Sequence, residues 1–149
     1  MKAVIQRVKE ASVEVGGETL TEIGKGLVVF LGVEKGDSLK DAEFLSGKVV
    51  KLRCFEDESG KMNLSAKDID GELLVVSEFT LCADLLRGRR PGFEPAAPPQ
   101  EAEKLYRDFI TLLEARGIKA KEGRFKEYMT VRIANDGPVT FILDSRQRP

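Results

Sequence analysis

The 149-residue chain contains no histidine. This absence excludes every nucleophile system in which an imidazole acts as the base, such as Ser-His-Asp and Cys-His, and every metal site that uses imidazole. A general base on a side chain would have to be Glu, Asp, Lys or Tyr. The chemistry of this protein must therefore come from other groups, among which the peptide backbone gains importance.

Cysteine is nearly absent too. Cys54 and Cys82 are the only two, and they form no CxxC pair. The sequence therefore predicts neither a disulfide framework nor a thiolate metal site, and buried thiols are expected. We expect no metal ion and no cofactor.

Long apolar runs are missing as well. Nothing approaches the ~18 consecutive apolar residues that span a membrane, and the opening MKAVIQRV lacks the apolar stretch of a signal peptide. These absences favour a cytoplasmic protein without a membrane partner.

The residues that are present indicate one globular domain over residues 1–149. Apolar residues make up 42% and charged residues 33% of the chain, with a net charge of -1. Because the charge is balanced, the whole surface is not that of a nucleic-acid binder. Two local basic clusters, Arg87–Pro91 and Ser145–Pro149, could hold phosphates, although charged loops are often simply solvated.

The first third of the chain is typical of sheet. Loose alternation predicts strands at Ala3–Val8 and Ser12–Val15, and Gly16-Gly17 predicts a hairpin turn into Glu18–Ile23. The run Leu27–Val33 is wholly apolar, which predicts a central strand covered on both faces.

Two helices are predicted. Asp37 or Ser38 can cap the first, and Asp41, three residues after Ser38, fits a capping box. Its apolar positions are Ala42, Leu45, Val49 and Leu52. The second helix follows Pro98-Pro99 and ends at Gly117. Its apolar stripe is Ala102, Leu105, Tyr106, Phe109, Leu112 and Leu113.

Further strands are predicted at Leu73–Val76, Ile118–Lys121, Tyr128–Ala134 and Val139–Leu143. Between the first of these and the second helix, the stretch Arg87–Pro99 is rich in Gly, Pro and Arg and indicates a long surface loop, a common place for function. The fold class is therefore mixed α/β: a layered, mostly antiparallel, barrel-like sheet with two principal helices.

SEFTL, Ser77–Leu81, stands at the end of the most apolar strand. If the strand continues, Ser77, Phe79 and Leu81 share one face, and Glu78 and Thr80 share the other. Hydroxyls and a carboxylate would then gather where a buried strand emerges, which suits an active site. Ordinary capping of the strand by Ser and Thr is the other interpretation.

NDGPVT, Asn135–Thr140, lies between two apolar runs. Asn, Asp, Gly and Pro are turn formers, so spacing alone favours a β-hairpin. Yet Gly137 permits close approach of another backbone or a ligand, and a Gly-Pro bond can be cis in ~5% of folded cases. The segment could instead present its carbonyls as rigid acceptors.

SEFTL and NDGPVT together resemble the two signature motifs of the D-aminoacyl-tRNA deacylase family, formerly D-tyrosyl-tRNA deacylases, which read SQFTL and NxGPVT. The likeness extends over nearly the whole chain, from MKAVIQRVKEASVEV through GLVVFLGV, MNLS and GRRP to VTFILDSRQ. Departures are Glu78 where the family usually has Gln, Gly92 where Ser is common, and Lys126–Tyr128 where Gly-Ala-Asp is usual.

The resemblance implies a homodimeric tRNA-editing esterase whose partner is aminoacyl-tRNA. The substrate would be D-aminoacyl-tRNA, and also glycine mischarged onto tRNA-Ala. Ser77, Glu78, Phe79 and Thr80 would form the catalytic pocket floor, with Met129 in its wall. On the same reading Gly137-Pro138 is cis and enters the partner subunit's pocket, where its carbonyls select chirality, and Arg7 helps to hold it.

For the mechanism, the resemblance implies activation of water with the help of the substrate's ribose hydroxyl. Thr80 acting as an acyl-accepting nucleophile is the competing mechanism, and it lacks an evident base unless Glu78 serves. Two other functions stay open: a non-catalytic RNA-end binding module of the same fold, and a structural, dimerising β-protein in which NDGP is only a turn.

Overall fold

The computed structural model describes all of residues 1–149 and contains eight strands and two α-helices. The strands are β1 (Lys2–Val15), β2 (Glu18–Ile23), β3 (Gly26–Gly32), β4 (Arg53–Glu56), β5 (Met62–Ser65), β6 (Glu72–Ser77), β7 (Lys119–Glu122) and β8 (Thr130–Asp144). The helices are α1 (Leu39–Lys51) and α2 (Pro99–Ala115), with short 3-10 turns η1 (Phe79–Cys82) and η2 (Ser145–Gln147).

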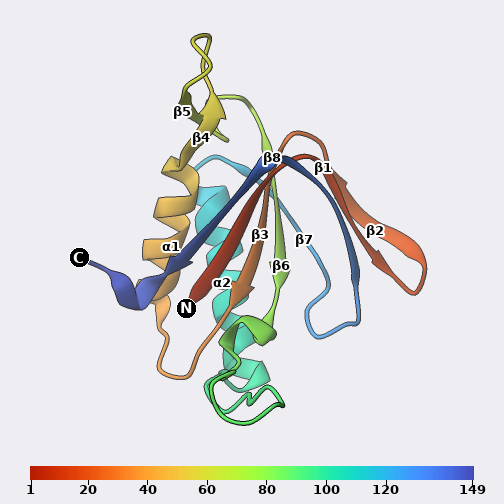
Figure 1. Cartoon of the computed structure of the whole chain (residues 1–149), viewed down its shortest axis with the longest axis vertical. Helices are drawn as coiled ribbons and strands as arrows, with labels where there is room; N and C mark the ends of the chain where they lie inside the picture. Colours follow the sequence, from red (N-terminus) through yellow and green to blue (C-terminus); the bar gives the residue numbers. More distant parts are fainter.

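The main sheet has the order β2-β1-β3-β6-β7, and β8 pairs along β1. All three pairings of β1 are antiparallel, whereas β3–β6 and β6–β7 are parallel. The sheet curls strongly, so that β2 approaches β7 and the Lys121 ammonium donates to the Glu22 carbonyl at 2.8 Å. Figure 1 shows α1 and α2 side by side, and the long β1 and β8 running together from beside the helices toward β2. The predicted barrel-like sheet with two helices is confirmed.

Two apolar clusters occupy the two faces of the sheet. The larger, of 22 buried residues, lies between the sheet and both helices, and the smaller, of 7, lies inside the curl. β3 contributes Leu27, Val29 and Leu31 to the first and Val28 to the second. Its unbroken apolar run is thus explained, because both faces of the strand are covered.

The helix boundaries follow the predicted signals. Ser38 is the residue before α1, and its amide donates to the Asp41 carboxylate at 2.8 Å, which completes the capping box. Burial, the largest single effect, raises the pKa of the Asp41 carboxyl. Hydrogen bonds, among them those from Ser38, outweigh burial, so the pKa is lowered overall. α2 begins at Pro99 and ends before Gly117, which has a φ of 80°.

The strand predictions needed two changes. The segments predicted separately as Ala3–Val8 and Ser12–Val15 form one strand: Lys9 lies at an irregularity of the ladder, and Glu10 pairs with Ala134 of β8. The strand predicted from Tyr128 begins only at Thr130.

The hairpin favoured for NDGPVT is wrong. β8 runs through this segment, and both of its halves pair antiparallel with β1, from Glu14↔Thr130 to Lys2↔Asp144. The register jumps from Val8↔Asn135 to Gln6↔Thr140, so Asp136–Val139 bulge out of a continuous ladder. The turn-forming residues supply a local excursion, not a reversal of the chain.

Candidate active site

An apolar pocket of about 740 Å³ lies where β6 ends. Its volume is within the range typical of small-molecule sites. The lining includes the whole predicted floor, Ser77, Glu78, Phe79 and Thr80, and Met129 of the predicted wall. The structure therefore brings these five residues together.

The predicted geometry of the floor was wrong in one respect. β6 ends at Ser77, and the chain turns into η1 after the Glu78 amide donates to the Leu31 carbonyl at 2.9 Å. Phe79 and Thr80 therefore do not alternate as on a strand. The Thr80 hydroxyl donates to the Glu78 carboxylate, so the hydroxyl and the carboxylate are adjacent in the pocket.

Gly32 at the end of β3 makes this turn possible. A Cβ there would lie 3.0 Å from Cys82 Sγ and 3.1 Å from the Glu78 carbonyl oxygen. Because glycine has no Cβ, η1 packs directly over the end of β3. The floor is thus held against the central strand of the sheet.

The pocket wall contains residues that the sequence did not single out. Phe93 packs edge-on against Phe79, with ring centroids 5.0 Å apart, and Ala96, Ala97 and Ala102 complete this side. These residues come from the loop before α2 and from its first turn. The Gly-Pro-Arg composition of that loop was the available signal, but it identified no individual residue.

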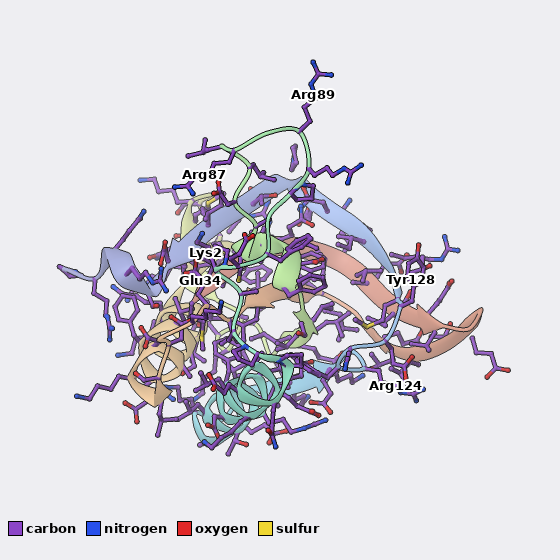
Figure 2. The ribbon with its side chains drawn as sticks, turned by 90° about the horizontal axis from the view of Figure 1, so that it is seen from below. Lys2, Glu34, Arg87, Arg89, Arg124 and Tyr128 are labelled. Atoms are coloured by element: carbon purple, nitrogen blue, oxygen red, sulfur yellow. The ribbon has the colours of Figure 1, made fainter.

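Met129 and its neighbours form the opposite wall. The Met129 sulfur accepts from the Arg124 amide at 3.4 Å and folds over Gly123, where a Cβ would lie 2.8 Å from it. Lys126, Glu127 and Tyr128 also line the pocket, and Tyr128 is 92% exposed. Figure 2 shows Tyr128 at the edge of the molecule.

Arg7 lies beneath the NDGPVT excursion. Its side chain is buried, and it donates to the Asp136 carbonyl at 3.2 Å and to the Cys54 carbonyl at 2.7 Å. Its guanidinium also pairs with the Asp136 carboxylate at 3.4 Å. The base of the excursion is therefore fixed by a buried cation with two carbonyl acceptors.

The Asn135 side chain joins the two ends of the Asp136–Val139 excursion by hydrogen bonds. Its amide donates to the Val139 carbonyl at 3.0 Å and to the Arg7 carbonyl at 3.2 Å, and its oxygen accepts from the Val139 amide at 3.2 Å. Between these bonds the Gly137-Pro138 peptide is cis, and both residues are exposed. The excursion is held at its ends and open at its tip.

Gly137 and Pro138 do not line the apolar pocket of the same chain. Arg7 pairs with Leu27 in β3, whereas the pocket begins at Leu31 of that strand. Four residues of strand separate the two positions, ~13 Å at the usual rise. The predicted residues thus form two groups on one chain, with Ser77, Glu78, Phe79, Thr80 and Met129 in one and Arg7, Gly137 and Pro138 in the other.

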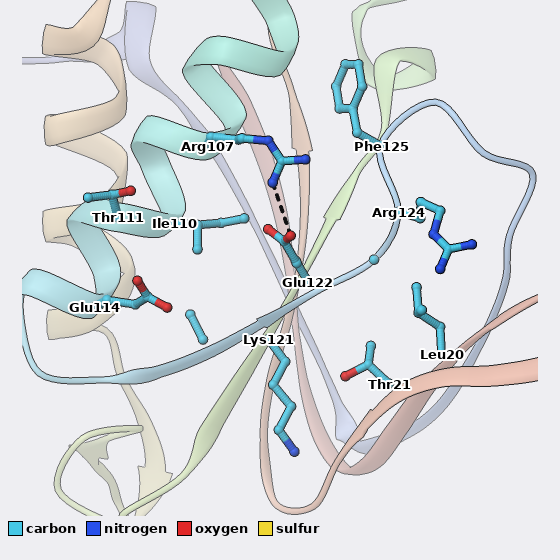
Figure 3. Close-up of a pocket in the computed structure, with 12 residues that line it drawn as sticks. Leu20, Thr21, Arg107, Ile110, Thr111, Glu114, Lys121, Glu122, Arg124 and Phe125 are labelled. Atoms are coloured by element: carbon cyan, nitrogen blue, oxygen red, sulfur yellow. Dashed lines mark hydrogen bonds and ion pairs between the residues drawn. The ribbon is translucent and has the colours of Figure 1, made fainter.

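A second pocket of about 740 Å³ lies between α2, β7 and β2 (Figure 3). Arg107 donates to Glu122 across it at 3.1 Å, and this bond raises the pKa of Arg107. Glu114, Lys121 and Arg124 also line it. Its charged groups are paired or extend into solvent, so this pocket offers a ligand little apolar surface.

The two thiols are buried, as predicted. Burial raises the pKa of Cys54 and of Cys82 to about 11 in each case, so both stay protonated near neutral pH. No group of three or more Cys, Asp or Glu side chains is arranged to hold a metal ion, and no helix is long and apolar enough to cross a membrane.

Comparison with known proteins places these features in a family. The family model described as D-Tyr-tRNA(Tyr) deacylase matches residues 4–144. The D-aminoacyl-tRNA deacylase of Thermodesulfovibrio yellowstonii is 61% identical over 98% of this chain and 100% of its own length. That of Dehalococcoides mccartyi is 58% identical over 99% and 97%.

Solved structures agree. A c-Myc DNA unwinding element binding protein superposes with a TM-score of 0.91 at 46% identity, over 97% of this chain and 98% of the other. A probable eukaryotic D-amino acid tRNA deacylase shares the fold, with a TM-score of 0.81 at 14% identity over 95% and 97%. A full-length match, with both signature segments at ordered sites, has one consequence: the chain belongs to the D-aminoacyl-tRNA deacylase family.

Proposed function

We propose that this protein is an esterase that hydrolyses the bond between a D-amino acid and the 3'-terminal ribose of tRNA. One observation carries the proposal: in a chain of this family, Ser77–Thr80 line an apolar pocket large enough for an aminoacyl group. The names of the relatives support the substrate class. Glycine mischarged onto tRNA-Ala is included, since it has no side chain to exclude.

The protein's share of catalysis is orientation and electrostatic stabilisation. Phe79 and Thr80 begin η1, and the first amides of a helical turn have no acceptor within it. Placed at the pocket floor, these N–H groups stabilise the oxyanion of the tetrahedral intermediate, at ~3 kcal/mol per donor. The 2'-hydroxyl of the terminal ribose helps to activate the attacking water, because the chain has no histidine.

Chirality is selected by the Gly137-Pro138 segment of a second copy of the chain. Within one chain this segment is remote from the pocket and exposed, which is what a contribution in trans requires. Backbone acceptors that bind the α-amino group leave one direction for the side chain, so an L-residue would meet the wall. The active unit on this proposal is a homodimer.

The first test compares the two enantiomers. Purified protein should release D-tyrosine from D-Tyr-tRNA and leave L-Tyr-tRNA nearly intact, in the presence of a chelator. Equal rates on both enantiomers would contradict the chirality proposal. Sedimentation of the same sample should give the mass of a dimer.

A variant of the excursion tests the trans contribution. Gly137→Ala places a Cβ 2.6 Å from Val139 Cγ2 at a φ of +133°, so the tip must shift. Discrimination between D and L should fall while the circular dichroism spectrum is unchanged. Unaltered discrimination would remove this segment from the selection of chirality.

The competing mechanism uses Thr80 as the nucleophile with Glu78 as its base, and their hydrogen bond is the observation in its favour. Thr80→Ala separates the two mechanisms. Loss of nearly all turnover with substrate binding kept would establish the nucleophile, whereas substrate assistance predicts that most turnover survives.

The second candidate function is a non-catalytic RNA-end binding module of the same fold. Glu78 in the floor and Lys126–Tyr128 in the wall are the residues that favour it, since they depart from the usual family pattern. Tight binding of D-Tyr-tRNA without release of the amino acid would support this function over the esterase.

A further inference from the structure

The chain between η1 and α2 carries a basic loop, residues 84–92. It is closed by two backbone hydrogen bonds, from the Asp84 amide to the Gly92 carbonyl at 2.7 Å and from the Gly92 amide to the Asp84 carbonyl at 2.9 Å. Gly88, with a φ of +72°, lies in the turn. The basic loop is thus a defined hairpin with a fixed base.

The arginines of the basic loop have almost no partners in the chain. Arg89 and Arg90 are exposed and form neither an ion pair nor a hydrogen bond, and Arg87, 92% exposed, only approaches Asp84 at 3.8 Å. Figure 2 shows Arg89 at the tip, directed away from the body of the protein. By contrast, Arg107 and Arg132 are each paired with glutamates.

The same loop exposes two adjacent leucines. Leu85 is 72% and Leu86 96% exposed, and Leu86 is the most exposed large apolar residue of the chain. Single exposed leucines are ordinary, but two beside three exposed guanidinium groups form a surface with both charge and apolar contact area. Nucleic acid offers the complement, because phosphates alternate with the apolar faces of bases.

The basic loop is built directly onto the pocket. η1, which contains the floor residues Phe79 and Thr80, leads into the loop, and the loop leads on to Phe93, whose ring packs on Phe79. A substrate whose aminoacyl group fills the pocket must extend its nucleotides past this rim. The position therefore specifies RNA as the partner of the loop, in contrast to a protein or a membrane.

We propose that the basic loop binds the acceptor arm of tRNA near the ester, with Arg87, Arg89 and Arg90 on phosphates and Leu85 and Leu86 against a base. The inference rests on the proposed function, which supplies the pocket's occupant. The loop then contributes affinity for the RNA and takes no part in the chemical step. Truncated substrates without phosphates should be insensitive to it.

The experiment compares two substrates and two double variants. Arg89→Ala/Arg90→Ala should raise KM for D-Tyr-tRNA about tenfold at moderate salt and leave kcat unchanged. The slope of log kcat/KM against log salt concentration should become shallower by about 1.5 to 2. On D-tyrosyl-adenosine, which has no phosphate, the variant should equal the wild type. Arg107→Ala/Arg132→Ala, which removes the same charge elsewhere, is the matched control.

Apolar contact is tested separately. Leu85→Ser/Leu86→Ser should weaken binding of uncharged tRNA, measured by fluorescence anisotropy, without changing the salt slope. An equal loss on D-tyrosyl-adenosine and on D-Tyr-tRNA would overturn the proposal, because the loop would then be shaping the pocket. A changed sedimentation mass or loss of binding to anionic vesicles, with tRNA binding intact, would overturn it in favour of a subunit contact or a membrane surface.

The anisotropy measurement also separates the two proposals. If the wild type hydrolyses neither substrate, the esterase function fails, yet salt-dependent binding of uncharged tRNA through the basic loop is still measured. If hydrolysis occurs and neither variant pair alters tRNA binding, the loop proposal alone fails.

Discussion

The two pockets of about 740 Å³ have contrasting linings. The pocket at the end of β6 is mostly apolar, and its floor carries the polar groups of one short segment, Ser77–Thr80. The pocket between α2, β7 and β2 is lined by several charged side chains, of which Arg107 and Glu122 pair with each other. Volume therefore does not identify a site. A few polar groups gathered on an apolar lining do, because the apolar surface binds a ligand and the polar groups orient it.

A large side chain introduced into each pocket from α2 should give the largest difference in activity between the two pockets. Ala102 and Thr111 both lie on α2, the first in the wall of the apolar pocket and the second in the charged one. Ala102→Phe should reduce kcat/KM on D-Tyr-tRNA by roughly a hundredfold or more, because the aminoacyl group is displaced. Thr111→Phe should change it less than about twofold, on the same principle. Similar losses in both would erase the distinction between the pockets.

Removing one carboxylate from each pocket should give a smaller difference in kcat between the two variants. Glu78→Gln keeps a hydrogen-bond acceptor for the Thr80 hydroxyl, so we expect kcat to stay within about tenfold of the wild type, well below the loss of a general base. Glu122→Gln should leave kcat unaltered. A fall of ~10³ or more for Glu78→Gln would instead make this carboxylate the base.

The two buried thiols can be examined by titration. Cys82 is the buried last residue of η1, and the Cys54 carbonyl accepts a hydrogen bond from Arg7. Burial raises both thiol pKa values to about 11, against ~8.5 in an unfolded chain. Between these values the unfolded chain loses protons that the folded one keeps, so the free energy of unfolding should fall as pH rises from about 8.5 to 11.

Urea unfolding across that pH range checks this sign. Cys54→Ala/Cys82→Ala should be less stable throughout, yet its stability should depend less steeply on pH. An unchanged pH dependence would mean that the thiols are not the groups responsible. Native protein should also resist alkylation by iodoacetamide at pH 8, measured by mass spectrometry.

The smallest effect is expected in the charged pocket. Arg107→Ala removes exposed ion pairs with Glu103 and Glu122, which contribute ~0.2–1 kcal/mol to stability. The thermal midpoint should fall by a few degrees at most, and kcat/KM should be unchanged. A large loss of activity would mean that this pocket also takes part in function.

Much of the fold follows from local patterns. The apolar run of β3, the capping box of α1 and the glycine after α2 each predicted an element correctly, because burial and backbone geometry act at short range. The charged residues Lys9 and Glu10 concealed the continuity of β1, since the strand continues there through the pairing of Glu10 with the distant β8. Pairing over such separations is not encoded in a local pattern.

The site shows the same limit. The composition of NDGPVT is that of a turn, and only the pairing of both flanks with β1 reveals an excursion from a strand. In the same way, Ser77–Thr80 were found as a group, but their faces were wrong because Gly32, far away in the sequence, lets the chain turn into η1. The two sequence motifs identified the site residues, but tertiary contacts determine the backbone conformation and therefore which way these residues face.

The Asp136–Val139 excursion of β8 also bears on how fast the protein can respond to a substrate. Both of its flanks are laddered to β1, and Asn135 and Arg7 hold its base, so it has no hinge about which it could swing. Its tip is therefore held in place, unlike a flap that closes over a ligand. If this segment selects the substrate as proposed, the rate of recognition would then be set by the diffusion and orientation of the incoming aminoacyl-tRNA, with no closing step beforehand.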